Sequence, residues 1–152
     1  MYIRECRQSD LPAVRGIEEA CYGVADALPL IALTQYLELC GAGFVVCECE
    51  SRLAGFAIAG TALEDGELGW ILNVAVASGF QGRGIGPTLC ERLLGVLSRK
   101  GVSRVRATAA PNNARSLKML QGLGFVIIDD LPDYFGSGQS RLLMERSISG
   151  IR

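Results

Sequence analysis

Hydrophobic residues along the chain recur with two different spacings, and the spacing changes several times. Runs of apolar and β-branched residues predict strands, whereas apolar residues three or four positions apart predict helices. The predicted strands cover residues 2–6, 43–50, 53–60, 67–76, 104–109, 125–129 and 141–146. The predicted helices cover residues 11–21, 28–40 and 84–100, and a fourth follows Asn113. This order is typical of a mixed α/β domain.

Several boundaries carry residue signals of their own. Ser9 and Asp10 precede the first helix, where short polar side chains accept hydrogen bonds from the first N–H groups, so we expect them to cap it. Ser51-Arg52 separates two strand-like runs and predicts the turn of a hairpin. Gly101 follows the third helix, as expected for a glycine that ends a helix in the left-handed conformation.

Length and composition narrow the class of protein. The 152 residues are 49% hydrophobic and contain no repeat or linker, so we expect one domain spanning residues 1–152. The net charge is −1 and aromatic residues make up 7% of the chain, which argues against a nucleic-acid partner. No apolar run approaches the roughly 18 residues of a membrane span, and the first residues are charged. We therefore expect a cytoplasmic protein without membrane contact.

The six cysteines are predicted to have a structural role. The cysteines at positions 6, 21, 40, 47, 49 and 90 show no C-x-x-C spacing, and the chain has no histidine. Zinc sites in proteins are built from such cysteine pairs and histidines, so the sequence predicts no metal site. We expect six reduced thiols packed in the core.

A glycine-rich segment, GFQGRGIG at residues 79–86, separates a predicted strand from a predicted helix. A helix N-terminus carries free N–H groups and a partial positive charge, and glycines there let a phosphate approach the backbone. A tight strand-to-helix turn without ligand is the alternative. A nucleotide-binding P-loop is excluded because Pro87-Thr88 follows Gly86 in place of Lys-Ser/Thr. A Rossmann loop is disfavoured because hairpin-like strands precede this one.

Three segments together resemble one enzyme family. Residues 81–86, QGRGIG, fit the Q/R-x-x-G-x-G/A pyrophosphate loop of the GCN5-related N-acetyltransferases, and they follow LNVAV at 72–76. Residues 111–125 are similar to that family's segment from an asparagine to a closing Gly-Phe, and residues 133–146 resemble the closing strand of its ribosomal-protein-alanine (RimI-like) branch. The resemblance implies a mixed, mostly antiparallel sheet of about seven strands flanked by helices. This sheet would be splayed between the fourth and fifth strands to admit acetyl-CoA.

The resemblance also implies which residues bind the co-substrate. The backbone of Val74, Ala75 and Val76 would pair with the pantetheine arm of acetyl-CoA like an additional strand. The pyrophosphate would lie on the loop formed by Gln81, Gly82, Arg83, Gly84, Ile85 and Gly86, with Arg83 adding a charge. The amide of Asn113 would bind the pantetheine or thioester, although Asn113 is also suited to be a simple helix cap.

The catalytic side chains depart from those of the family. The branch uses a glutamate on the fifth strand as base and a tyrosine on the next helix as acid, but those positions hold Thr108 and Leu120. We therefore predict Glu67 as the base and Tyr134 as the proton donor or a wall of the acceptor site. Alternatively, Glu64, Asp65 and Glu67 solvate a turn. Tyr22 and Tyr36 fall where family substrate loops lie, and packing explains them equally well.

Taken with the resemblance, the sequence predicts an acetyl-CoA-dependent N-acetyltransferase that acts on a primary amine. A protein or peptide N-terminus is the favoured acceptor, because its pKa of about 8 suits a site without a strong base better than the value of about 10.4 for lysine. A small-molecule amine acceptor is the alternative within enzymes. A non-catalytic acyl-CoA-binding module is the alternative outside them. A monomer or homodimer is expected.

Overall fold

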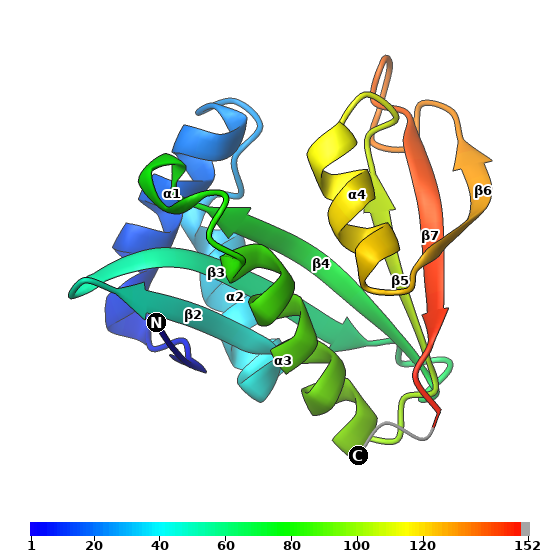
Figure 1. Ribbon diagram of the computed structural model, residues 1–152, viewed down its shortest axis with the longest axis horizontal. Helices are drawn as coiled ribbons and strands as arrows, with labels where there is room; N and C mark the ends of the chain where they lie inside the picture. Colours follow the sequence, from blue (N-terminus) through cyan, green and yellow to red (C-terminus); the bar gives the residue numbers. More distant parts are fainter. Residues whose placement is uncertain (150–152) are drawn as a thin grey trace.

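Seven strands form one mixed sheet in the order β1-β2-β3-β4-β5-β7-β6 in the computed structural model, which describes residues 1–149 (Figure 1). The strands are β1 (Tyr2–Glu5), β2 (Phe44–Cys49), β3 (Arg52–Thr61), β4 (Leu68–Val76), β5 (Arg104–Ala109), β6 (Val126–Leu131) and β7 (Arg141–Ser147). The helices are α1 (Leu11–Tyr22), α2 (Leu30–Cys40), α3 (Ile85–Arg99) and α4 (Ala114–Gly122), with short 3₁₀ turns η1 (Gln8–Asp10), η2 (Gly41–Gly43) and η3 (Ser78–Phe80). The predicted alternation of helices and strands is confirmed.

Pairing between β4 and β5 is confined to one end of these strands. They run parallel and pair only over Leu68–Trp70 and Arg104–Arg106, whereas every other strand pair is antiparallel. Beyond Trp70, β4 continues to Val76 with β3 alone as its neighbour, and β5 continues with β7. The two limbs of the sheet diverge from this joined end (Figure 1). The predicted mixed sheet with a splay between the fourth and fifth strands is confirmed.

Two apolar clusters hold the helices on the sheet. Leu89, Leu93 and Leu97 of α3 recur every four residues, so they share one helix face and pack against the sheet from one side. On the opposite side, residues of α1 and α2 such as Val14 and Leu33 pack on Phe44 and its neighbours. Burial of each such side chain stabilises the fold by about 1.5 to 3 kcal/mol.

The predicted turn of the β2–β3 hairpin is wrong by one residue. The turn residues are Glu50 and Ser51, with φ of 53° and 61°, whereas the sequence predicted Ser51-Arg52. Cys49 pairs with Arg52, so β2 ends and β3 begins one residue earlier than predicted. A two-residue hairpin whose central residues both have positive φ matches the twist of the flanking strands, which explains the shift.

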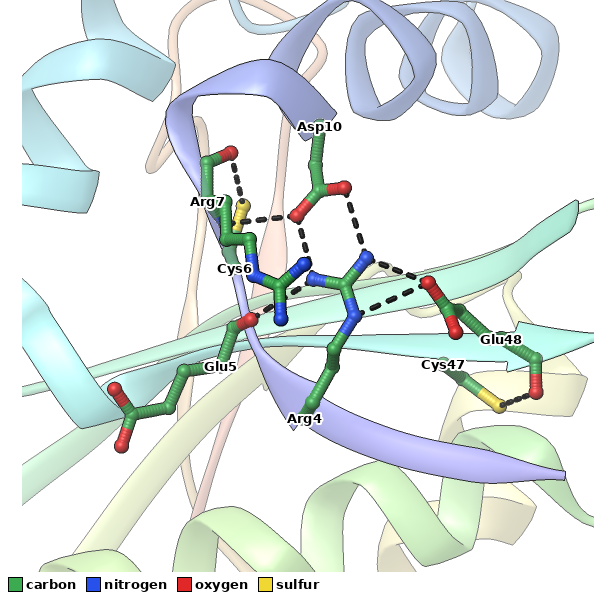
Figure 2. A network of polar contacts seen from close by, with 7 residues as sticks. All are labelled: Arg4, Glu5, Cys6, Arg7, Asp10, Cys47 and Glu48. Atoms are coloured by element: carbon green, nitrogen blue, oxygen red, sulfur yellow. Dashed lines mark hydrogen bonds and ion pairs between the residues drawn. The ribbon is translucent and has the colours of Figure 1, made fainter.

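The start of α1 differs from prediction in its chemistry. Asp10 occupies the N-cap position, but its side chain forms no capping bond to α1. Instead, its carboxylate accepts two hydrogen bonds from Arg4, at 2.7 and 2.9 Å, and one from the N–H of Arg7 at 2.7 Å. Arg4 also binds Glu48 on β2 at 2.7 Å (Figure 2). Charge-assisted, two-pronged bonds to a guanidinium are stronger than a neutral cap, which explains why Asp10 turns away from the helix.

We expect Asp10→Asn to lower the free energy of unfolding by about 1 to 2 kcal/mol at pH 7, between the values for exposed and buried ion pairs. The hydrogen bonds from Arg4 hold the pKa of Asp10 below its usual range, so the carboxylate stabilises the fold above the unfolded-state pKa of about 3.9. That stabilisation is lost as the pH falls through the lower folded-state pKa. Urea unfolding between pH 7 and 3 should show the variant and the parent converging. Glu19→Gln, which breaks the surface pair with Arg15, is the control; an equal loss in both variants would contradict the account.

Candidate active site

The free edge of β4 presents alternate peptide groups to the opening. The Ala77 N–H bonds Ala54 on β3, and antiparallel pairs alternate between bonded and unbonded residues. The main chain of Ala75 therefore faces β3, while the main chains of Val74 and Val76 face the side that β5 has left. The side chains of Val74 and Val76 pack against the α3 core, so only their peptide groups are available to a ligand.

Three side chains, two from the end of α1 and one from the loop after β4, already lie against this edge. The Tyr22 hydroxyl donates to the carbonyl of Val74 at 3.0 Å. The Gln81 amide donates to the carbonyl of Val76 at 3.0 Å, and the Cys21 thiol lies 3.4 Å from the same oxygen. These contacts show that both carbonyls point into the opening, where a carbonyl's second lone pair stays available to a ligand N–H.

The glycine-rich loop continues directly from this edge. Gly82 and Gly84 both have φ of 78°, which other residues adopt at a cost, and open space lies where their side chains would be. Within residues 1–149, the N–H groups of residues 82–86 donate to no protein acceptor. Gly86 differs, because a Cβ there would lie 3.1 Å from the sulfur of Met119. Gly82 and Gly84 thus keep the surface open, and Gly86 lets α3 approach α4.

The loop's Arg83 is turned away from the helix N-terminus. Its guanidinium binds Glu50 at 3.0 Å and the Gly79 carbonyl at 3.2 Å. It also lies 5.0 Å from the centre of the Phe80 ring, and Arg52 lies at the same distance from that ring. A role for Arg83 at a phosphate would require it to leave Glu50.

Gln81 links the two limbs of the sheet. Besides donating to Val76, its side-chain oxygen accepts a hydrogen bond from Arg115 in the first turn of α4. This connection spans the opening, because Val76 belongs to the β4 limb and α4 to the β5 limb. The sequence predicted Gln81 as a binding residue but gave no sign of this bridge.

Asn113 caps α4 with one half of its amide. Its Oδ1 accepts from the N–H of Ser116 at 3.1 Å, so the capping role that the sequence left open is present. The Nδ2 group is a donor with no protein acceptor within the described residues. Both predicted roles are therefore compatible, since they use different atoms.

Neither position that departs from the family carries an ionisable group. Thr108 is half-buried on β5, where it pairs with Leu143. Leu120 is only 3% exposed and belongs to the α3-side core together with Phe125. A tyrosine at position 120 would therefore have to fit a packed core, which makes Leu120 a structural residue in this chain.

The two predicted catalytic residues lie in different surroundings. Glu67 precedes β4 at its joined end, where its carbonyl accepts the N–H groups of Ser103 and Arg104. Val74 lies seven positions beyond Glu67, roughly 23 Å along an extended strand, which argues against the predicted role of Glu67 as base. Tyr134 lies in the β6–β7 connection, 46% exposed and stacked edge-on to Phe135.

A carboxylate that the sequence did not single out lies beneath the edge. Glu18 of α1 is only 2% exposed, and it accepts the N–H of Leu28 at 3.1 Å and the amide of Asn73 at 2.9 Å. Burial raises the pKa of Glu18, while these hydrogen bonds oppose the increase. Asn73 follows Leu72, the residue bulged out of the β3–β4 ladder. Glu18 therefore ties α1, the α1–α2 connection and β4 together beside the bulge.

Nearby charges and burial shift the pKa of the Tyr22 phenol at the end of α1. Burial raises the pKa of Tyr22 to about 12, the charge of Glu18 adds to this, and the guanidinium of Arg141 opposes it. Arg141 is held by the Ser140 carbonyl at 2.8 Å and lies 4.9 Å from the centre of the Phe135 ring. The charge of Arg141 on β7 therefore bears on the protonation of Tyr22 on α1.

The cysteines are free thiols, as predicted, but they are not all in the core. Cys6, Cys47 and Cys90 are buried, and the other three are half-buried. Burial raises the pKa of Cys90 to about 12, so this thiol stays protonated. Among residues 1–149, no helix combines the length and the apolar character that a membrane span requires.

The comparisons with known proteins identify the class. A model of the acetyltransferase (GNAT) family matches residues 11–125. The chain therefore belongs to the GNAT acetyltransferase family. It is an acyltransferase, and the predicted family, fold class, enzyme class and acetyl-CoA co-substrate are confirmed at the level of this family.

Relatives in one branch of the family are similar over most of the chain. Identity to the ribosomal protein bS18-alanine N-acetyltransferase of Salmonella typhimurium is 32% over 124 residues, which are 77% of this chain and 75% of that protein. Identity to the enzyme of the same name from Escherichia coli K12 is 28% over 126 residues, or 81% and 79% of the two chains. The predicted resemblance to this branch is confirmed.

Solved structures show the same fold. The ribosomal-protein-alanine N-acetyltransferase of Brucella melitensis superposes with a TM-score of 0.83 at 26% identity, covering 97% of this chain and 100% of that one. Ard1 from Thermoplasma volcanium gives 0.87 at 22%, covering 97% of both chains. YncA from Salmonella typhimurium, determined with its cofactor acetyl-CoA, gives 0.82 at 23%, covering 100% and 96%.

Proposed function

We propose that this chain transfers the acetyl group of acetyl-CoA to the α-amine of a protein or peptide. The observation that carries the proposal is the run of main-chain groups from Val74 and Val76 to residues 82–86, which have no main-chain partner on this side within residues 1–149. Amide groups of a pantetheine arm pair with such a strand edge, and a pyrophosphate binds free N–H groups at a helix N-terminus. Gln81 bonds both Val76 and Arg115, and the cap at the start of α4 leaves the amide donor of Asn113 unused by the described residues, which supports the predicted set. The side chain of Ala75 packs in the core. Arg83 can add a charge at the pyrophosphate only if its guanidinium leaves Glu50.

The acceptor side favours a peptide. The α1–α2 connection (residues 23–29) and the β6–β7 connection (residues 132–140) lie at the end where the limbs diverge (Figure 1). Two segments on either side of the opening suit an extended chain that enters between them. The relatives named as ribosomal protein bS18-alanine N-acetyltransferases, at 32% and 28% identity, support an α-amine acceptor.

The described side chains suit a substrate amine that is already partly deprotonated in solution. Thr108 on β5 is not a base, Glu67 lies far along β4, and the carboxylate of Glu18 is buried and already holds two donors. Glu18 therefore acts by holding Asn73 on β4 and Leu28 in the α1–α2 connection. An α-amine with a pKa of about 8 is deprotonated in a substantial fraction at neutral pH, so positioning supplies most of the rate.

The acceptor class can be tested with matched amines and acetyl-CoA at pH 7.5, following release of free CoA thiol. We expect kcat/KM for a peptide with a free N-terminus to exceed that for the same peptide with a blocked N-terminus and one lysine by roughly 200-fold, the ratio of neutral amine fractions at this pH. A diamino acid represents small-molecule acceptors, because a diaminobutyric acid acetyltransferase is 33% identical over 75 residues. A preference for the small amine would contradict the peptide proposal. No turnover despite acetyl-CoA binding would favour the non-catalytic module.

Substitutions at Asn113 separate its two roles. Asn113→Asp and Asn113→Ser both keep an oxygen that caps α4 but remove the amide donor, and serine adds no charge. We expect both to fold with nearly unchanged stability and to bind acetyl-CoA about tenfold more weakly, as measured by calorimetry. Weakening in the aspartate variant alone would indicate charge repulsion. Parental affinity in both would leave Asn113 with the capping role only.

A further inference from the structure

The phenol that relatives of this branch carry on the helix after the fifth strand is replaced by a packed Leu120, yet a phenol does reach the free edge of β4. It comes from the last residue of α1. The Tyr22 hydroxyl lies 3.0 Å from the carbonyl of Val74, which faces the opening. The residue is 44% exposed as a whole, but its hydroxyl end is directed at the backbone.

We propose that Tyr22 is the proton donor to the departing CoA sulfur, so that α1 supplies the acid that α4 lacks. This rests on the proposed function. A pantetheine arm that starts at residues 82–86 and follows the edge reaches Val76 first and Val74 second. Its thiol lies a short link beyond its last amide, so the arm ends beside the hydroxyl of Tyr22. The hydroxyl has one proton, so it turns from the Val74 carbonyl to the sulfur when the arm is bound, and a ligand N–H takes its place on that carbonyl.

The groups around Tyr22 suit a proton donor that gives up its proton and regains it in each turnover. Glu18 lies one helical turn earlier, and together with burial it keeps the phenol protonated near neutral pH. Arg141 on β7 supplies a positive charge that stabilises a transient phenolate. Cys21, the remaining titratable neighbour, contacts Val76 and has a pKa raised by burial, so it stays a neutral thiol.

The step balances without another reactant. The neutral amine forms the C–N bond to the acetyl carbon, and the C–S bond breaks with its electron pair on sulfur. Tyr22 gives its proton to that sulfur, which leaves as free thiol. The proton that the new amide nitrogen loses returns through water to the phenolate. General acid assistance of this kind is worth typically about 10² to 10⁴ in rate.

Two readouts on Tyr22→Phe test the proposal, with Tyr2→Phe on the distant β1 as the matched control. The first is turnover of the best amine acceptor: we expect kcat to fall about 100-fold with the dissociation constant for acetyl-CoA changed less than about threefold. The second needs no turnover. It is the pKa of the thiol of bound CoA, followed by thiolate absorbance. A phenol that donates to sulfur should make this pKa about one unit lower in the parent and in Tyr2→Phe than in Tyr22→Phe.

The outcomes separate the two proposals. Loss of kcat together with the one-unit difference in thiol pKa supports Tyr22 as the donor. Unchanged kcat overturns it, as does a lower kcat with equal thiol pKa values, which would make Tyr22 a residue that only holds the edge. If the parent acetylates no amine, the proposed function fails. The thiol pKa still decides whether Tyr22 reaches the sulfur.

Discussion

The parting of β4 and β5 after Trp70 is the constraint on which the site depends. Backbone N–H and C=O groups without partners are unfavourable away from water, and an open strand edge pairs readily with another chain. In this chain, side chains from α1 and from the loop after β4 form hydrogen bonds with the exposed edge. Tyr22 and Gln81 occupy the carbonyls of Val74 and Val76, and Arg115 holds Gln81 from the other limb. The same groups that satisfy the free edge also line the position where a substrate would lie.

The rest of the fold keeps that edge in place. Apolar residues of α3 pack under the half of β4 that lacks β5, and α1 covers the opposite face. Buried Glu18 joins α1 to Asn73 next to the bulge at Leu72, and Gly86 allows α3 to pack closely against α4. The glycine loop can therefore leave its N–H groups free, because the loop is anchored at both ends by packed elements.

Local patterns were sufficient for the elements and for the loop. Apolar spacing predicted every helix and strand, and the glycines at 82 and 84 marked the turn whose positive φ values the structure shows. Contacts between distant segments were beyond local reasoning. Asp10 was predicted as a cap, but Arg4 on another element competes for its carboxylate. Glu67 precedes the same strand that carries Val74, but an extended strand places the two roughly 23 Å apart. Glu18 gave no signal, since a Glu-Glu pair in a helix is typical of a solvated face.

Backbone hydrogen exchange tests the central claim that the edge of β4 is the binding surface. The account predicts that saturating CoA slows exchange of the Val74 and Val76 N–H groups by at least about tenfold, because a ligand then occupies peptide groups that now face the opening. The N–H of Ala75, which faces β3, should change little and serves as the internal reference. Unchanged exchange at Val74 and Val76 in a protein shown to be saturated with CoA would contradict the account.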